Sequence, residues 1–177
     1  MIVCSIPRCG ATKYCLDLQE STGLEFVGEL HPIHINSSRK ADEHETGMQT
    51  NFTPDEFAKL IHYNKDHIVL INQHSYLMVD RASFVILRKN MADASLSFCN
   101  FMLKMYPSIK PAALLHQLRV MHNDHLGLTA YLNKYPRDII WYEDYYNTEG
   151  TSTPLLDKYI GKDLILKEIN TYYGTHI

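Results

Sequence analysis

The sequence lacks an apolar run near the roughly 20 residues that a membrane-spanning helix needs, so no such span is expected. Its N-terminus has no basic stretch followed by an apolar one, which predicts no secretory signal. The four cysteines, Cys4, Cys9, Cys15 and Cys99, form no Cys-x-x-Cys pair. We therefore expect free thiols and a cytoplasmic location rather than a disulfide framework.

The chain also lacks an excess of charge of one sign. Lys and Arg number 17 and Asp and Glu number 20, which gives a net charge of −3. This balance argues against a generally basic nucleic-acid binder, but it leaves room for a local anion site. Neither a nucleic acid nor a membrane is an expected partner, and the oligomeric state is open.

What is present is the composition of an ordinary soluble domain. Of 177 residues, 45% are hydrophobic and 21% are charged. At about 100–200 residues per domain, residues 1–177 form a single domain. A globular chain of this size buries about 70% of its unfolded surface, so its core needs no disulfide or metal.

Short apolar runs alternate with helical patterns along the chain. Strands are expected at residues 2–6, 24–30, 67–72, 83–87 and 137–142. Helices are expected at residues 12–20, 53–63, 91–106 and 111–135, with a break near Gly127, and within 154–173. Because the strands are short and continuously apolar, the pattern predicts an α/β fold with a central parallel sheet of about five strands flanked by helices. The polar stretch from His31 to Asn51 predicts a long functional loop, mobile or ordered only with ligand.

The first strand leads through Pro7-Arg8-Cys9-Gly10-Ala11-Thr12-Lys13 into a helix. Such a strand–turn–helix presents backbone N–H groups and a positive helix end to an anion. Arg8 and Lys13 add charge, and Gly10 permits a close approach of the backbone. A thiol at a helix start can also have a lowered pKa, which makes Cys9 a candidate of interest. The structural alternative is a plain turn capped by Thr12.

The ATP-type phosphate loop, G-x-x-x-x-G-K-[ST], fits this segment poorly. With its second glycine on Gly10, its lysine position falls on Ala11 and its first glycine on Ser5. The segment instead resembles the 5′-phosphosulfate loop of sulfotransferases, Pro-[Lys/Arg]-Ser-Gly-[Ser/Thr]-Thr. Pro7, Arg8, Gly10 and Thr12 match it, whereas Cys9 and Ala11 replace hydroxyl residues.

A second segment, residues 84–97, resembles the 3′-phosphate motif of the same family, a strand followed by Arg-x-x-x-x-x-x-x-Ser. The spacing fits Lys89 with Ser97, whereas the arginine at the strand end is Arg88, and Ser95 is a further alternative. Residues 139–144, ending in Tyr-Glu-Asp, resemble a late strand of the family, in which the glutamate is structural. The late Gly-rich basic segment has no clear counterpart.

The resemblance implies a compact, divergent sulfotransferase with a P-loop-like nucleotide-binding architecture over residues 1–177. Its donor would be 3′-phosphoadenosine 5′-phosphosulfate, and its acceptor a hydroxyl or amine on a small molecule or saccharide. The donor site would comprise residues 8–13 with Arg88, Lys89, Ser95 and Ser97, and Arg8 would also stabilise the transition state.

Two residues suit the base that sulfuryl transfer needs. Glu29 ends the second strand, where one group of sulfotransferases places a catalytic glutamate. His74 follows the third strand and resembles the Lys-x-His stretch of cytosolic members, although Gln73 departs from that pattern. We favour Glu29, with His74 as the second choice.

No catalytic metal is expected, because the histidine clusters at 31–44 and 116–125 lack the spacing of a zinc site. A P-loop-like phosphotransferase remains open, as does a degenerate member that binds a nucleotide or a protein partner without turnover.

Overall fold

The computed structural model describes residues 1–29, 67–72, 74–146 and 153–174. Five strands form one sheet in the order β2-β3-β1-β4-β5, and every neighbouring pair is parallel. The strands are β1 (Ile2–Ser5), β2 (Glu25–Glu29), β3 (His67–Ile71), β4 (Phe84–Leu87) and β5 (Ile139–Trp141). The predicted α/β class with a central parallel sheet of five strands is confirmed. The long loop predicted from His31 to Asn51 and the helix predicted at 53–63 lie outside the described residues.

The two central strands are buried on both faces, which is why they read as continuous apolar runs. All four residues of β1 are buried, as are four of the five residues of β3. In the register, Cys4 of β1 lies opposite Ile71 of β3 on one side and Val85 of β4 on the other. The carboxyl ends of these three strands therefore reach the same edge of the sheet.

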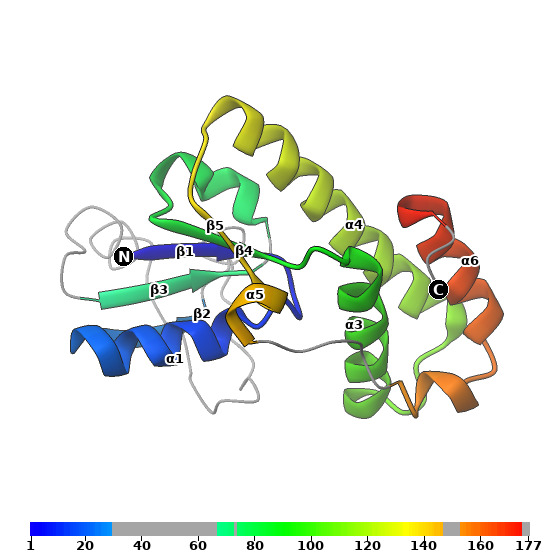
Figure 1. Cartoon of the computed structure of the whole chain (residues 1–177). Helices are drawn as coiled ribbons and strands as arrows, with labels where there is room; N and C mark the ends of the chain where they lie inside the picture. The colour runs from blue at the N-terminus through cyan, green and yellow to red at the C-terminus, as the bar shows by residue number, and fades with distance from the viewer. Residues whose placement is uncertain (30–66, 73, 147–152, 175–177) are drawn as a thin grey trace, which may run out of the picture.

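Helices cover both faces and the carboxyl edge of the sheet (Figure 1). α1 (Ala11–Thr22) lies on one face, whereas the 3-10 helix η2 (Ser75–Arg81) and α4 (Pro111–Lys134) lie on the other. α3 (Met91–Met105) and α6 (Lys162–Tyr173) stand beyond the carboxyl ends of the strands, and α5 (Tyr142–Tyr146) and η3 (Leu156–Lys158) are short. Within the described ranges, no helix has both the length and the apolar character needed to cross a membrane.

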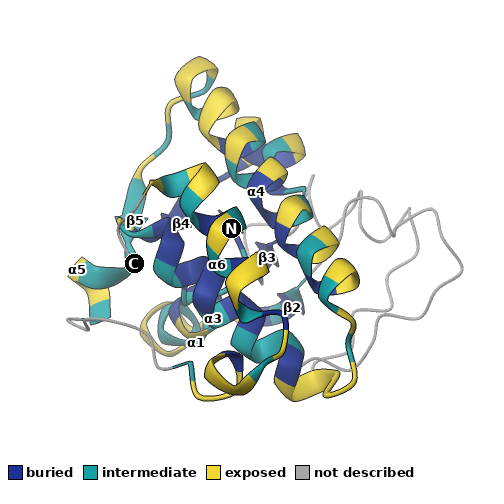
Figure 2. Cartoon of the chain, turned by 90° about the vertical axis from the view of Figure 1, so that its right-hand side faces the viewer, coloured by how far each residue is buried: buried dark blue, intermediate teal, exposed yellow. Residues whose placement is uncertain are grey.

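A second apolar core joins the helices beyond the sheet edge. Leu103 of α3, Leu114 and Leu118 of α4 and Ile165 and Ile169 of α6 are all buried in it. The exposed sides of these helices face outward (Figure 2). This helical layer therefore lies next to the carboxyl edge of the sheet.

Two local features differ from the sequence-based expectation. α4 continues through Gly127 without a break. The glycine leaves room for Tyr76 of η2, since a Cβ at Gly127 would lie 3.0 Å from Tyr76 Cδ1. The last strand ends at Trp141, and a helix that the sequence pattern did not predict, α5, begins at Tyr142.

Candidate functional site

The connection that follows β1 and those that follow its neighbours β3 and β4 pass to opposite faces of the sheet. The β1 connection, α1, leaves to one face of the sheet, whereas β3 continues into η2 on the opposite face. β4, on the other side of β1, continues through α3 into α4, which packs on η2. In open α/β sheets a ligand binds in the crevice outside the carboxyl ends at such a switch point. The topology therefore brings the segments that follow β1, β3 and β4 to one place.

The segment after β1 begins α1 without a side-chain cap. Gly10 occupies the N-cap position in a left-handed conformation, with φ 76°, and α1 begins at Ala11 rather than at a cap on Thr12. The first intrahelical bond runs from the Tyr14 N–H to the Gly10 carbonyl at 3.1 Å. The N–H groups of residues 11–13 precede that bond, so the positive end of α1 is directed out of the sheet edge.

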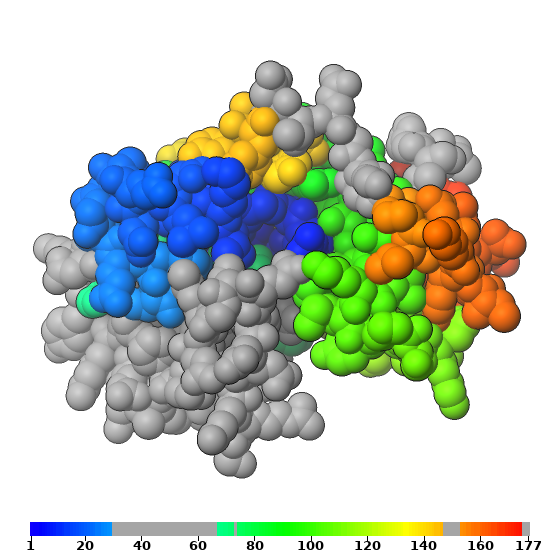
Figure 3. Space-filling view, turned by 90° about the horizontal axis from the view of Figure 1, so that it is seen from below, coloured from blue at the N-terminus to red at the C-terminus, as the bar shows by residue number. Residues whose placement is uncertain are grey.

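Arg8 connects the loop at residues 7–13 with the segment at residues 84–97. Its Nε donates to Ser97 Oγ of α3 at 3.3 Å, and its guanidinium lies 5.0 Å from the centre of the Phe101 ring. Arg8 also has a φ of 68°, and in the described part of the chain only His74, at 51°, shares a positive φ among non-glycine residues. Figure 3 shows the loop after β1, in dark blue, between α1 and α3.

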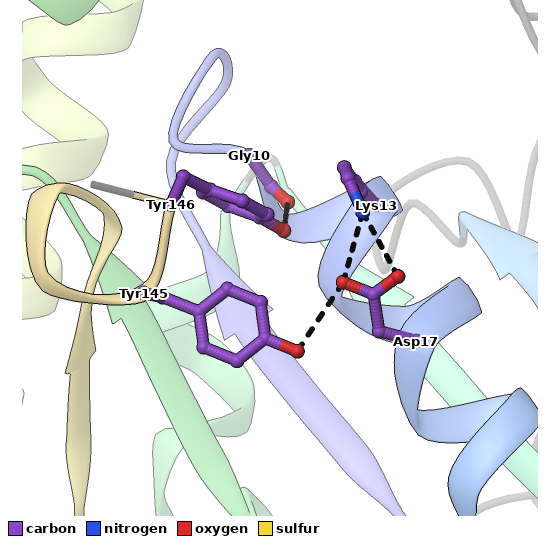
Figure 4. Close-up of polar contacts among 5 residues, drawn as sticks. All are labelled: Gly10, Lys13, Asp17, Tyr145 and Tyr146. Carbon is purple, nitrogen blue, oxygen red and sulfur yellow. Dashed lines mark hydrogen bonds and ion pairs between the residues drawn. The ribbon is translucent and has the colours of Figure 1, made fainter. Parts of the chain in front are cut away.

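Cys9 and Lys13 do not direct their side chains to an anion. Cys9 is fully buried, and that burial raises the pKa of its thiol to about 12, opposite to the expected lowering. The Lys13 ammonium donates to the Asp17 carboxylate at 3.0 and 3.1 Å, which raises the pKa of Lys13 (Figure 4). The buried Cys9 thiol therefore does not reach a phosphate, and the Cys9 backbone N–H already donates to the Ile6 carbonyl at 3.3 Å.

The basic turn after β4 is held by the chain around β5. Arg88 is only 8% exposed, and its guanidinium lies 4.1 Å from the centre of the Tyr142 ring. The Lys89 N–H donates to Glu143 Oε2 at 2.9 Å, and the Lys89 ammonium pairs with Asp144. Glu143 thus supports the turn through its carboxylate.

The two serines of α3 face different neighbours. Ser97 faces Arg8, as described above, whereas Ser95 is fully buried. Ser95 Oγ donates to the Met91 carbonyl at 3.0 Å and lies 3.3 Å from His122 Nε2 of α4. The structure therefore brings Ser97 to the loop after β1 and leaves Ser95 inside the helical layer.

Tyrosines of α5 cover the start of α1 (Figure 4). The Tyr146 hydroxyl donates to the Gly10 carbonyl at 3.0 Å, and the Tyr145 hydroxyl donates to Asp17 Oδ2 at 3.2 Å. A Cβ at Gly10 would lie only 2.5 Å from Tyr142 Cδ2. The sequence analysis missed this cover, although three tyrosines directly after the last strand were a visible signal.

Each candidate base has a polar partner. Glu29, at the end of β2, accepts a hydrogen bond from Asn72 Nδ2 at 3.0 Å. His74 Nδ1 lies 3.1 Å from Asp124 Oδ1 of α4, and the His74 backbone N–H donates to Asp124 Oδ2 at 3.1 Å. Asp124 was missed, because no local pattern links residues 50 positions apart.

Among the described residues, no group of three or more His, Cys, Asp or Glu side chains is placed to hold a metal ion. Comparisons with protein-family models, with curated proteins and with solved structures give no match to this chain. The site is therefore interpreted from its own geometry.

Proposed function

We propose that this protein is a sulfotransferase that uses 3′-phosphoadenosine 5′-phosphosulfate as donor. The acceptor would be a hydroxyl or amine of a small molecule or saccharide. The observation that carries the proposal is the contact between Arg8 Nε and Ser97 Oγ at 3.3 Å. It joins the segment resembling the 5′-phosphosulfate loop to the one resembling the 3′-phosphate motif, at the switch point of a parallel sheet.

In this proposal the donor's two anionic ends are held by different elements. The N–H groups at the start of α1 and the Arg8 guanidinium bind the phosphosulfate. Ser97 donates its hydroxyl to the 3′-phosphate from α3. Arg88, buried behind Tyr142, adds positive charge at the end of β4.

The reaction is a direct transfer. A base, Glu29 or His74, takes the proton from the acceptor as the acceptor oxygen or nitrogen forms its bond to sulfur. The bond between sulfur and the bridging oxygen breaks, and adenosine 3′,5′-bisphosphate leaves with that electron pair. Arg8 and the loop N–H groups stabilise the charge that develops on the bridging oxygen. We place the reaction in the cytoplasm, where the four free thiols would stay reduced.

A binder without turnover is the second candidate, and the tyrosine cover favours it. The Tyr146 hydroxyl donates to the Gly10 carbonyl, and the Tyr142 ring lies against the Arg88 guanidinium. α5 must therefore shift if the sulfuryl donor is to reach both the start of α1 and Arg88. A protein that binds adenosine 3′,5′-bisphosphate yet transfers nothing to a broad panel of hydroxyl and amine acceptors would support this candidate.

The first prediction concerns the donor nucleotide. Titration calorimetry should show that adenosine 3′,5′-bisphosphate binds more tightly than AMP, because only the former has a 3′-phosphate for Ser97. At 100 times its dissociation constant the nucleotide should stabilise the fold by about 2.7 kcal/mol.

Two variants locate the nucleotide. Arg8→Ala should weaken both ligands, and Ser97→Ala should weaken adenosine 3′,5′-bisphosphate selectively. Arg119→Ala is the matched control, since Arg119 pairs with Glu168 on the helical layer and should leave both affinities unchanged. Equal affinity for the two nucleotides would contradict the proposal.

A further inference from the structure

We infer that Asp124 is a positioning residue, which holds His74 in the tautomer protonated at Nδ1 and leaves the Nε2 lone pair free to act as the base. This inference rests on the proposed sulfuryl transfer, and it assigns the base to His74 rather than to Glu29. Asp124 itself touches neither donor nor acceptor in this scheme.

Both oxygens of the Asp124 carboxylate are directed to one residue. Oδ1 lies 3.1 Å from the His74 ring at Nδ1, and Oδ2 accepts the His74 backbone N–H at 3.1 Å. The backbone bond is a hydrogen bond, whereas the Nδ1 contact is a close approach of charge outside hydrogen-bond geometry. Because a carboxylate oxygen at this distance repels the lone pair of a neutral ring nitrogen, it favours the proton on the nitrogen that faces it.

The pair is packed against neighbouring side chains. The Asp124 side chain is only 4% exposed, whereas that of His74 is 25% exposed. The ring of Tyr76 meets the His74 ring edge to face, with the centres 6.0 Å apart. Burial raises the pKa of Asp124, and this effect outweighs the lowering by the His74 backbone N–H and by the charge of a protonated His74 ring. Of these contacts, the backbone N–H favours the carboxylate form while the His74 ring is neutral.

The backbone of His74 supports a functional reason for this arrangement. Its φ of 51° belongs to the left-handed region, which non-glycine residues rarely adopt. Such strain gathers at functional sites and persists when contacts hold it in place. Here the Asp124 carboxylate supplies one such contact, and the segment lies next to the end of β1.

Glu29 differs from His74 in the character of its partner. Asn72 donates its amide N–H to the Glu29 carboxylate at 3.0 Å. His74 instead has a carboxylate next to its ring, which stabilises the imidazolium formed on proton transfer. The transferred proton goes from the acceptor to His74 Nε2 and then to solvent after the products leave.

Asp124→Asn tests the inference without changing side-chain size. The His74 backbone N–H still requires an oxygen at the Oδ2 position, so the amide NH2 takes the Oδ1 position and faces Nδ1. That donor forces the His74 proton onto Nε2 and removes the basic lone pair. Turnover should fall by about 10²–10⁴, while affinity for adenosine 3′,5′-bisphosphate stays unchanged.

The tautomer of His74 distinguishes this positioning role from a purely structural one, because a structural role of Asp124 would not change it. In the full chain labelled with ¹⁵N-histidine, with His74 assigned by the His74→Gln variant, NMR should show the proton on Nδ1. In Asp124→Asn it should move to Nε2. Asp163→Asn on the exposed side of α6 is the control for loss of an acid and should change neither tautomer nor turnover.

A wild-type His74 protonated at Nε2, or normal turnover in Asp124→Asn, would overturn the inference. So would an active His74→Gln beside an inactive Glu29→Gln. Failure of the proposed function has a different signature: no binding of adenosine 3′,5′-bisphosphate by wild-type protein. Because the tautomer is measured without substrate, it decides the role of Asp124 even in that case.

Discussion

Individual residues at the carboxyl edge of the sheet adopt costly backbone conformations. Arg8 and His74 have positive φ values, and Gly10, between Arg8 and α1, has a φ of 76°. Glycine suits that position for two separate reasons. It adopts the left-handed conformation without penalty, and it leaves room for the Tyr142 ring.

Gly10→Ala should therefore destabilise the protein more than its backbone conformation alone requires. The left-handed conformation costs an alanine roughly 1–2 kcal/mol, and the Cβ clash with Tyr142 should add to that loss. Urea denaturation measures the free energy of unfolding. Gly23→Ala is the matched control, because Gly23 has a φ of 72° and nothing within 4 Å of its added Cβ. Equal losses in the two variants would contradict a contact role for Tyr142.

At the scale of elements, η2 and α4 form the surface that carries the proposed base. His74 caps η2, Asp124 lies on α4, and Tyr76 of η2 packs against Gly127 one turn further along α4. The close approach at Gly127 lets the two elements meet. The contact at Gly127 thus lies close to the His74–Asp124 pair on the same two elements.

The effect of Gly127→Ala on the free energy of unfolding should depend on whether residue 76 is Tyr or Ala. Alanine in a helix interior is about 1 kcal/mol more favourable than glycine, yet its Cβ would lie 3.0 Å from Tyr76 Cδ1. We expect no gain in wild-type protein and a gain of about that size in the Tyr76→Ala background. Thermal or urea unfolding of the four proteins gives the coupling energy. The same gain in both backgrounds would argue against close packing here.

At the scale of the whole molecule, the helical layer contains a buried histidine. His122 is fully buried between Ser95 of α3 and Tyr172 and Tyr173 of α6. Burial lowers its pKa from the ordinary 6.5 to about 4, opposed by the charge of Glu168 and assisted by that of His125. Between pH 6.5 and about 4, His122 is therefore neutral in the folded state and protonated in the unfolded chain.

This difference in protonation predicts acid sensitivity. Between pH 6.5 and about 4 the unfolded chain binds more protons at residue 122, so stability is complete above pH 6.5 and falls as the pH is lowered. The contribution of His122 to that loss is about 3 kcal/mol. Urea denaturation at a series of pH values measures it, and His122→Asn should flatten the slope. An unchanged slope in that variant would assign the acid sensitivity to other groups.

The sequence alone determined the class of fold, because that information is local. The apolar runs at residues 2–6 and 67–72 are continuous since both faces of β1 and β3 are buried. The strand–turn–helix at residues 7–13 was visible for the same reason, as its glycine and basic residues are neighbours in the chain.

Only the tertiary structure decided which side chains meet. Arg8 and Ser97 are 89 positions apart, and His74 and Asp124 are 50 positions apart, so no periodicity links them. The same holds for the tyrosines of α5 over Gly10 and for the burial of Cys9, which reversed the expected pKa shift of its thiol. Short runs reveal which faces of strands and helices are buried, whereas a site forms where the ends of different elements converge, and that convergence depends on the packing of the whole chain.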